Sequence, residues 1–336
     1  MSAPKFDFMV VGAGIAGLAA ARLLQSAGHP TAVLESNAKV GGRIATYRHG
    51  NCRYDYGAQN LKGADRDLAK EASALGLKVR PIVEPVWLHE AGITRPGDPA
   101  ANAEAKWTYE GGLDALPERL AAGLTLCFNV TVNRLIESSG EVLALDISGN
   151  TVCRARRAVL AVPAPIAAGI LERSETRAKR AAPLLREAQY SRCLTVMLEF
   201  EPNLADWPYY ALIASDRSHP LLWLARENCK GYLEAGTGLV AQLGPAISEE
   251  MWSHSEEKIV DATLCWVAEV CGQSNAHPTW SRIHRWPHAQ PLHTISFDAA
   301  NQGSSNIVIC GDAVARARVP DAYASGLKAA RKLLAI

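Results

Sequence analysis

The sequence lacks any apolar run of 18 or more residues, so no membrane-spanning helix is expected. It also lacks an excess of charge, because 35 Lys and Arg residues balance 34 Asp and Glu residues. The resulting net charge of +1 gives no reason to expect nucleic acid or a membrane surface as a partner. With 336 residues, 48% of them apolar, the chain is long enough to form two intertwined domains with a sizeable core.

Cysteine motifs are missing as well. There is no Cys-x-x-Cys pair and no Cys/His cluster at zinc spacing among the eight cysteines, which stand at positions 52, 127, 153, 193, 229, 265, 271 and 310. We therefore predict reduced core cysteines in a cytoplasmic protein without a metal site. The first predicted strand begins within the first ten residues, which leaves no room for a signal peptide.

What the chain has instead is a glycine-rich stretch near its start. The apolar run 8–11 leads into Gly12-Ala13-Gly14-Ile15-Ala16-Gly17, and a helix of small residues is predicted from Leu18 to about Ala27. Gly12 permits a tight turn, Gly14 lets a pyrophosphate approach the backbone, and Gly17 lets the helix pack close to the sheet. The helix N-terminus then offers N–H groups and a positive dipole end to the phosphates.

An acidic residue follows this turn at the spacing that nucleotide binding requires. A second apolar run, 32–34, ends at Glu35, where a carboxylate can bond an adenosine ribose and would repel the 2′-phosphate of NADP. A glycine turn in an ordinary α/β protein is the alternative, but it does not account for the position of the acid. No second glycine turn of this type occurs, although enzymes that pass electrons from NAD(P)H through flavin to a disulfide normally carry one. The full context predicts an adenine-dinucleotide site.

Two later motifs favour FAD over NAD. Gly41-Gly42-Arg43 follows the acid closely, so that two glycines bring the backbone near the dinucleotide and a guanidinium can reach the pyrophosphate. Cys310-Gly311-Asp312 ends a late strand before the last helix. Its carboxylate can bond the ribityl or phosphate region, and the helix can point its N-terminus at the flavin. A simple turn before a helix is the alternative for this second motif.

The order of predicted elements indicates an α/β fold. We expect a Rossmann-like FAD-binding domain of the glutathione-reductase or p-hydroxybenzoate-hydroxylase type and a second, mixed-sheet α+β substrate domain. The predicted FAD-binding domain is discontinuous, with residues 1–75, 106–168 and 296–336, and the substrate domain takes residues 76–105 and 169–295. Within the former, a β-meander is predicted from four short strands at 124–128, 131–137, 142–147 and 151–154, with a separate strand at 157–163.

The motifs together resemble those of flavin-containing amine-oxidase-like proteins, in which they recur in the same order. Within that group the chain looks most like the renalase-type members. The motifs are Gly12–Gly17, Glu35, Gly41-Gly42-Arg43, Asp55-Tyr56-Gly57-Ala58-Gln59, Gly111-Gly112-Leu113, Val159–Pro165, His284-Arg285-Trp286, Gly311-Asp312 and Val319–Gly326.

This resemblance implies non-covalent FAD and a set of residues that bind it. Arg43 is expected at the pyrophosphate, the backbone of Val130 at the adenine, and Asp312 at the ribityl-phosphate segment. Gly57, Ala58 and Gln59 are expected against the isoalloxazine, and N–H groups near Ala322 and Tyr323 at the flavin pyrimidine. The full set is Gly12, Gly14, Ile15, Ala16, Gly17, Glu35, Gly42, Arg43, Gly57, Ala58, Gln59, Val130, Gly311, Asp312, Ala322 and Tyr323.

The chain also departs from the renalase-type pattern near the flavin. Ala313 stands where tryptophan is often found, and Val319-Pro320-Asp321 replaces the more usual Val-Glu-Gly. Pro320 suits the first turn of a helix but lacks an N–H. A carboxylate at Asp321 would oppose an anionic reduced flavin. These changes weaken the transfer of substrate identity more than that of the cofactor.

The resemblance further implies an FAD-dependent oxidoreductase. Its small-molecule substrate would be a dihydronicotinamide-type donor, such as an isomer of a reduced pyridine nucleotide, that gives hydride to flavin N5. O2 would be the acceptor and hydrogen peroxide the product. Alternatives on the same fold are an amine oxidase and a desaturase or isomerase. A flavin-binding protein without turnover is the alternative from a different class.

No catalytic residue is defined by the sequence. Tyr209 and Tyr210 can form an aromatic wall over the flavin or belong to the core of a sheet, and His288 can line the pocket or be structural. The pocket candidates are Gln59, Tyr209, Tyr210, His288 and Tyr323.

Overall fold

The computed structural model describes residues 4–62, 66–201, 204, 207–214, 219–233, 235–272, 277–303 and 306–335. The chain forms two compact units, one of residues 1–44, 116–190 and 290–336 and the other of residues 45–115 and 191–289. The predicted domain boundaries differ from this division, since they assigned 45–75 and 106–115 to the first domain and 169–190 and 290–295 to the second. The reason for the first difference is packing: Tyr54 and Tyr56 belong to a core cluster with Met197 and Val240 of the second unit.

The first unit is built on a sheet whose core is parallel. Strand β1 (Lys5–Val11) pairs in parallel with β2 (Thr31–Leu34) and with β13 (Thr151–Leu160). Strand β10 (Thr125–Cys127) pairs in parallel with β2, and β19 (Ile307–Ile309) with β13. The central strands are apolar and buried in their C-terminal parts, at 8–11 in β1 and 158–160 in β13, as segments covered on both faces require.

The predicted meander is wrong in its first strand, whereas its last strand pairs as predicted but is longer. The segment predicted at 124–128 is β10, at the parallel edge of the sheet, and takes no part in the meander. Strands β11 (Arg134–Ser138) and β12 (Glu141–Leu145) are antiparallel as predicted, and β12 pairs antiparallel with β13. The two strands predicted at 151–154 and 157–163 form the single strand β13, because no glycine or proline separates them.

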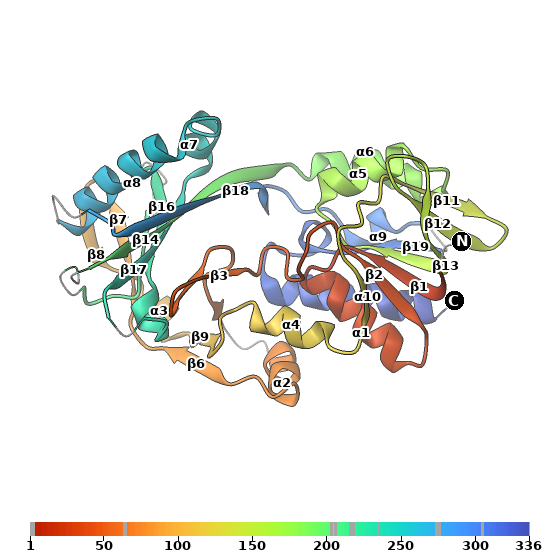
Figure 1. Cartoon of the computed structure of the whole chain (residues 1–336), viewed down its shortest axis with the longest axis horizontal. Coiled ribbons are helices and arrows are strands. Elements are labelled where there is room, and N and C mark those ends of the chain that lie inside the picture. Colours follow the sequence, from red (N-terminus) through yellow and green to blue (C-terminus); the bar gives the residue numbers. More distant parts are fainter. Residues whose placement is uncertain are drawn as a thin grey trace. The chain divides into compact units, whose positions relative to one another are not determined.

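Two long helices of the first unit lie side by side against its sheet (Figure 1). They are α1 (Ile15–Ser26) and α10 (Val319–Leu334). A Cβ atom at Gly326 of α10 would lie 2.0 Å from the Ala16 carbonyl oxygen of α1, so this glycine permits the close approach of the helices. The remaining helices are α4 (Ala115–Ala121), at the border of the units, α5 (Ala164–Glu172), η1 (Arg177–Ala181), α6 (Ala182–Glu187), α9 (Phe297–Ala300) and η3 (Asp312–Val314).

The second unit contains a mixed sheet, as predicted, in the order β18-β14-β17-β16-β15-β7-β8. Only the β15–β7 pair is parallel among its described pairings. Helix α8 (Glu256–Cys271) packs on this sheet through Ile259, Val267 and Val270, and begins at Ser255, whose hydroxyl accepts the Lys258 N–H. The strands are β7 (Val86–Glu90), β8 (Ile93–Pro96), β14 (Tyr190–Phe200), β15 (Ala211–Ala214), β16 (Leu221–Arg226), β17 (Thr237–Leu243) and β18 (Trp280–Pro291).

Smaller elements complete the second unit. They include a hairpin, β3 (Thr46–His49) with β4 (Cys52–Asp55), and a three-stranded sheet of β5 (Leu61–Lys62), β9 (Lys106–Tyr109) and β6 (Val79–Ile82). The helical segments are α2 (Arg66–Ala74), α3 (Pro99–Ala103), η2 (Glu227–Lys230) and α7 (Pro245–Glu250).

Two expectations from composition can be compared with the structure. All eight cysteines carry free thiols, as predicted, but the predicted core position holds only for Cys153 and Cys310, and Cys265 is exposed. Within the described part of the chain, every helix is too short or too polar to cross a membrane.

Candidate functional site

The glycine turn after β1 has the geometry that its sequence predicts. Gly12 has a φ of +103° and donates its N–H to the Leu34 carbonyl at 2.8 Å. A Cβ atom at Gly12 would lie 2.6 Å from the Ala161 carbonyl oxygen, and one at Gly17 would lie 2.0 Å from the Gly12 carbonyl oxygen. Both positions therefore require glycine, the first for the turn and the second for the close approach of α1 to the sheet.

The space beside Gly14 is open. This residue has an ordinary φ of −73° at the N-terminal end of α1, and no described atom lies within 4 Å of the position that a Cβ would take. The first helical hydrogen bond joins the Leu18 N–H to the Gly14 carbonyl at 2.9 Å. The N–H groups of Ile15, Ala16 and Gly17 precede it and are the unpaired donors typical of a helix start. Open space, N–H donors and a positive helix end fit a diphosphate.

Glu35 is buried directly after β2, and most of its hydrogen-bonding capacity is used. Its Oε1 accepts the N–H and the side-chain amide of Asn37 at 2.9 and 2.7 Å and the hydroxyl of Ser36 at 3.2 Å. Its Oε2 accepts the Ala13 N–H at 2.8 Å. Because a carboxylate oxygen has two lone pairs, Oε2 can accept one more donor, which fits a ribose hydroxyl.

The backbone of Val130 is only partly available for adenine. Its N–H donates to the Glu35 carbonyl at 2.9 Å. The predicted backbone pairing with adenine can therefore use the Val130 carbonyl but not its N–H in this structure. The hydrogen bond connects the segment after β10 to the acid after β2.

The second glycine motif brings its backbone next to the first. Gly41 and Gly42 have φ values of +115° and +55°, and the Gly41 N–H donates to the Ala13 carbonyl at 2.9 Å. A Cβ at Gly42 would lie 3.5 Å from the Cα of Gly14. The predicted role of Gly41 and Gly42, in which they bring the backbone to the dinucleotide, is consistent with this proximity.

Arg43 and Asp312, which the sequence assigns to separate parts of the cofactor, are paired with each other. Two guanidinium nitrogens of Arg43 donate to the two oxygens of Asp312 at 2.5 and 2.8 Å. The Tyr190 hydroxyl also donates to Asp312, at 2.9 Å, and the Tyr190 ring lies 5.6 Å from the guanidinium carbon. Sequence analysis missed Tyr190 because nothing near it in the chain marks it. Burial alone would lower the pKa of Arg43, but the pairing with Asp312 raises it.

The Tyr190 hydroxyl gives a test of this arrangement. We expect Tyr190→Phe to lower the free energy of unfolding by about 1.5 kcal/mol, because a donor to a largely buried carboxylate is lost. The control is Tyr47→Phe, whose hydroxyl only accepts a bond from the exposed Arg282. Urea unfolding of both variants measures the difference, and equal effects would show that the bond to Asp312 contributes nothing.

Helix α10 begins within one residue of its predicted start, and its first turn decides which N–H groups are available. The Ala322 N–H donates to the Arg318 carbonyl at 3.0 Å as the first helical hydrogen bond, so Ala322 and Tyr323 lie inside the ladder. The unpaired N–H groups of a helix start therefore belong to Val319 and Asp321, because Pro320 has none. The predicted flavin contact through N–H groups near Ala322 and Tyr323 can therefore use the Asp321 N–H, because the Ala322 N–H is bonded within the helix.

The segment Gly57-Ala58-Gln59 belongs to the second unit, whereas the other predicted cofactor-binding residues belong to the first. The Gln59 side chain is buried, and its oxygen accepts the Trp223 indole N–H at 3.1 Å. Its amide nitrogen donates to the Asp55 carbonyl. The Tyr210 hydroxyl donates to the Gln59 backbone carbonyl at 3.0 Å. Gln59 is thus an oriented group rather than a mobile one.

The other pocket candidates have different surroundings. Tyr209 lies in the core of the large sheet, with its ring 5.6 Å from Trp207 and 5.1 Å from Trp87. Tyr210 is fully buried. Both residues therefore fit the core alternative and not an aromatic wall. His288 is half-buried on β18, and Tyr323 is buried on α10.

A group of buried charges stands directly beside the Gln59 segment. Asp55, Glu227 and Lys230, which we call the charge cluster, have fully buried side chains. The Lys230 ammonium lies 3.1 Å from Asp55 and 2.8 Å from Glu227. Asp55 also accepts the Thr46 hydroxyl at 2.6 Å and the Leu113 N–H at 3.1 Å. Sequence analysis overlooked this cluster, and the only signal was an acid and a lysine three residues apart, at 227 and 230, between two strands.

The cluster holds two acids and one base, and its protonation reflects that imbalance. Burial raises the pKa of Glu227 to about 7. The neighbouring Asp55 also raises this pKa, whereas Lys230 lowers it. Burial by itself would lower the pKa of Lys230, but the two carboxylates together raise it well above its usual value. Lys230 is therefore charged at neutral pH, whereas the raised pKa of Glu227 favours its protonated form in the folded protein.

Glu227 is expected to make stability depend on pH. Because its pKa is about 7 in the folded protein and near 4.5 otherwise, the folded state binds the proton more tightly. Its stabilising contribution is complete below about pH 4.5 and is lost as the pH rises through 7. Between pH 5 and 8, the free energy of unfolding should fall by on the order of 2 kcal/mol relative to Glu227→Gln. Urea unfolding across pH measures this, with Glu257→Gln on the surface of α8 as control, and a constant difference would contradict it.

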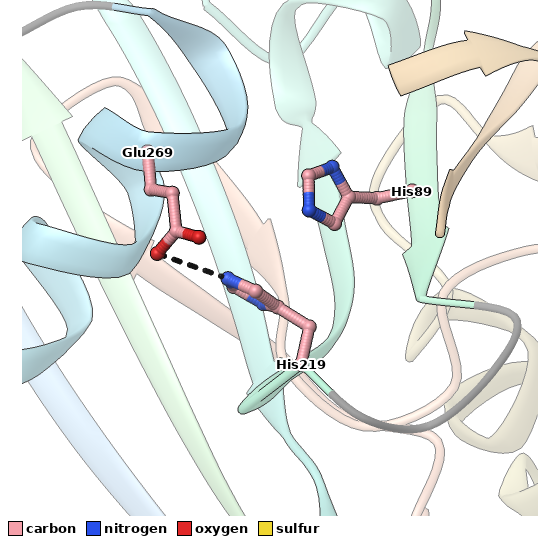
Figure 2. A group of neighbouring side chains, drawn as sticks. All are labelled: His89, His219 and Glu269. Carbon is pink, nitrogen blue, oxygen red and sulfur yellow. Dashed lines mark ion pairs between the residues drawn. The ribbon is translucent and has the colours of Figure 1, made fainter. Parts of the chain in front are cut away.

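A second group of titratable side chains lies elsewhere in the second unit. Figure 2 shows the rings of His89 and His219 and the carboxylate of Glu269 pointing toward one another. One ligand-type atom from each lies within 4.8 Å of the other two. The His219 Nε2 is 3.6 Å from Glu269, and the His219 side chain is 8% exposed. The residue types alone would suit a zinc-like ion.

The hydrogen bonds of the two histidines argue against a metal ion at this group. The Leu221 N–H donates to Nδ1 of His219 at 3.1 Å, so in the neutral ring Nε2 carries the proton and cannot ligate. The Thr94 hydroxyl donates to the Val270 carbonyl at 3.4 Å and accepts from Nδ1 of His89 at 2.9 Å, so His89 can offer at most its other ring nitrogen. One imidazole and one exposed carboxylate fall short of the three protein ligands usual for zinc.

The geometry of the first unit defines a class of protein. The first unit combines a glycine turn with open space beside it, a buried acid after β2 and a Gly-Asp turn before the final helix. These features are typical of a dinucleotide-binding flavoprotein with a Rossmann-like domain. A model of the NAD(P)-binding Rossmann-like domain matches residues 10–72. The model of the flavin containing amine oxidoreductases matches residues 87–334, and the chain belongs to that family. Membership implies FAD as the cofactor.

Individual relatives match over shorter stretches. An L-amino-acid oxidase of Siganus canaliculatus is 40% identical over 77 residues, which are 22% of this chain and 15% of that protein. The flavin-containing amine oxidase B of Rattus norvegicus is 40% identical over 81 residues, which are 24% of this chain and 16% of that protein. These matches thus span about a sixth of the relatives.

The fold extends further than the sequence similarity. The cyclohexylamine oxidase of Brevibacterium oxydans IH-35A superposes with a TM-score of 0.77 at 18% identity, over 98% of this chain and 99% of that one. A likeness at this identity shows a shared fold.

Proposed function

We propose that this chain is an FAD-dependent oxidase that takes hydride from a dihydronicotinamide-type donor. The observation that supports the cofactor part most directly is the open space at Gly14, lined by the first N–H groups of α1. FAD, when bound, supplies a two-electron acceptor at N5, from which the hydride and a proton pass to O2 and give hydrogen peroxide.

The protein's own residues then bind and orient. The first turn of α1 binds the diphosphate, and Oε2 of Glu35 accepts a ribose hydroxyl. Arg43, held in place by Asp312, keeps a positive charge beside the pyrophosphate. Gly57, Ala58 and Gln59 lie against the isoalloxazine in this proposal, with the Gln59 amide fixed by its protein partners.

A group of aromatic rings supports the proposal that the substrate is a flat, electron-rich hydride donor. Tyr56, immediately before Gly57, stacks on Trp286 with ring centroids 5.4 Å apart and planes inclined by 18°. The His284 ring lies 4.0 Å from Trp286 and 4.9 Å from Tyr56. Such surfaces can stack on a nicotinamide ring. A dihydronicotinamide needs no strong base to release hydride.

An amine oxidase is the second candidate, and a specific observation favours it. The family model and the relatives named above are amine or amino-acid oxidases by their descriptions. The desaturase or isomerase alternative has no such support.

Anaerobic mixing separates these candidates. The FAD-loaded protein is mixed with dihydro isomers of NAD(P)H, with cyclohexylamine and with L-amino acids, while absorbance near 450 nm is followed. Bleaching by the nicotinamide donors, and peroxide once air is admitted, supports the proposal. Bleaching by amines or amino acids alone assigns an amine oxidase. Bound FAD that no donor bleaches leaves the flavin-binding protein without turnover.

A further inference from the structure

We propose that the charge cluster of Asp55, Glu227 and Lys230 positions the loop 55–59, so that Lys230 and Glu227 act as positioning residues for the flavin-facing amide of Gln59. This inference rests on the proposed function, in which that loop lies against the flavin. The three side chains are fully buried. Asp55 is the first residue of the loop, and Lys230 pairs with both Asp55 and Glu227.

The cluster clamps Asp55 through both its backbone and its side chain. The Asp55 N–H donates to Glu227 at 3.0 Å, and Lys230 donates to both carboxylates, at 3.1 Å to Asp55 and 3.0 Å to Glu227. Replacing buried ion groups by apolar side chains often leaves stability unchanged or raises it. Stability alone therefore gives little reason for charges here, whereas directional bonds fix a backbone in a way that apolar packing does not.

The opposite side of Asp55 is held by the Gly111-Gly112-Leu113 motif. The Leu113 N–H donates to Asp55 at 3.1 Å. Gly112 has a φ of +110°, and a Cβ there would lie 2.7 Å from the Thr46 hydroxyl oxygen, which itself donates to Asp55. Gly112 must therefore be glycine for its backbone to lie this close to Thr46. This gives the Gly111-Gly112-Leu113 motif a physical role, to which the proposed flavin contacts assign none.

Asp55 is hydrogen-bonded directly to Gln59. The Asp55 backbone carbonyl accepts a hydrogen bond from the side-chain NH2 of Gln59, and the Trp223 indole N–H donates to the side-chain oxygen of Gln59 at 3.1 Å. These two bonds define which end of the amide faces which way. A displacement of Asp55 removes one of them, so the Gln59 amide loses its fixed orientation.

The test compares Lys230→Met with Lys258→Met, an exposed lysine of the same unit. In the flavin-free protein, hydrogen exchange of the amides at 56–60 should accelerate at least tenfold more in Lys230→Met than exchange of the β1 amides, which report the loss of global stability. In the FAD-loaded protein, flavin reduction at a saturating donor should be at least tenfold slower per bound FAD, with the donor KM within twofold. Lys258→Met should match the wild type in both measurements.

Wild-type exchange, or faster exchange with an unchanged rate of flavin reduction, would overturn the proposal. If Lys230→Met does not fold, Lys230→Met/Glu227→Gln removes opposite charges together and is judged by the same criteria. The exchange measurement needs no donor. A wild-type protein without FAD turnover therefore defeats the proposed function separately, while exchange at 56–60 reports on the clamp itself.

Discussion

Lys230→Met is expected to lower the free energy of unfolding by about 3–5 kcal/mol, the range for removing one partner of a buried ion pair. The substitution leaves Asp55 and Glu227 buried without their shared cation. One of the acids must then take up a proton, and the remaining carboxylate has lost its strongest donor. Chemical denaturation followed by tryptophan fluorescence measures the loss.

Two further variants separate charge balance from simple loss of a side chain. Lys258→Met changes an exposed residue and should stay within about 0.5 kcal/mol of the wild type. Lys230→Met/Glu227→Gln should recover a good part of the lost stability, because Asp55 alone still accepts the Thr46 hydroxyl and the Leu113 N–H. If the double variant is no more stable than Lys230→Met, the charge imbalance is not the cause.

Gly14→Ala is expected to fold normally and to bind FAD at least about 100-fold more weakly, which corresponds to roughly 2.7 kcal/mol. The φ of −73° suits any residue, and the added methyl would meet no described atom of the protein. It would instead occupy the space that a diphosphate needs in order to reach the first N–H groups of α1. Titration of the flavin-free protein with FAD, followed by flavin fluorescence, gives the affinity.

The controls for this variant are two other glycines. Gly17→Ala would place a Cβ 2.0 Å from the Gly12 carbonyl oxygen, so it should damage folding itself. Gly244→Ala, in the second unit, meets its nearest atom at 3.6 Å and should change neither folding nor FAD affinity. Wild-type affinity in folded Gly14→Ala would show that the diphosphate does not bind at this turn.

The aromatic candidates show where sequence reasoning reached its limit. Tyr209 and Tyr210 are adjacent in the chain, just before β15, yet their side chains have different surroundings. Tyr209 packs with Trp207 and Trp87, and Tyr210 bonds to Gln59. Nothing in the local pattern distinguishes such buried positions from a wall over a cofactor, because both require large apolar rings.

The sequence by itself determined the turn, the acid and the final helix of the cofactor-binding unit. Gly12, Gly14, Gly17 and Glu35 act within one strand–turn–helix–strand segment, where spacing along the chain sets position in space. Only the tertiary structure decided the contacts between distant segments. Arg43 meets Asp312 across 269 positions, and Lys230 meets Asp55 across 175. Folding removes water from these charged groups, so each charge is stabilised only by its partner in the pair.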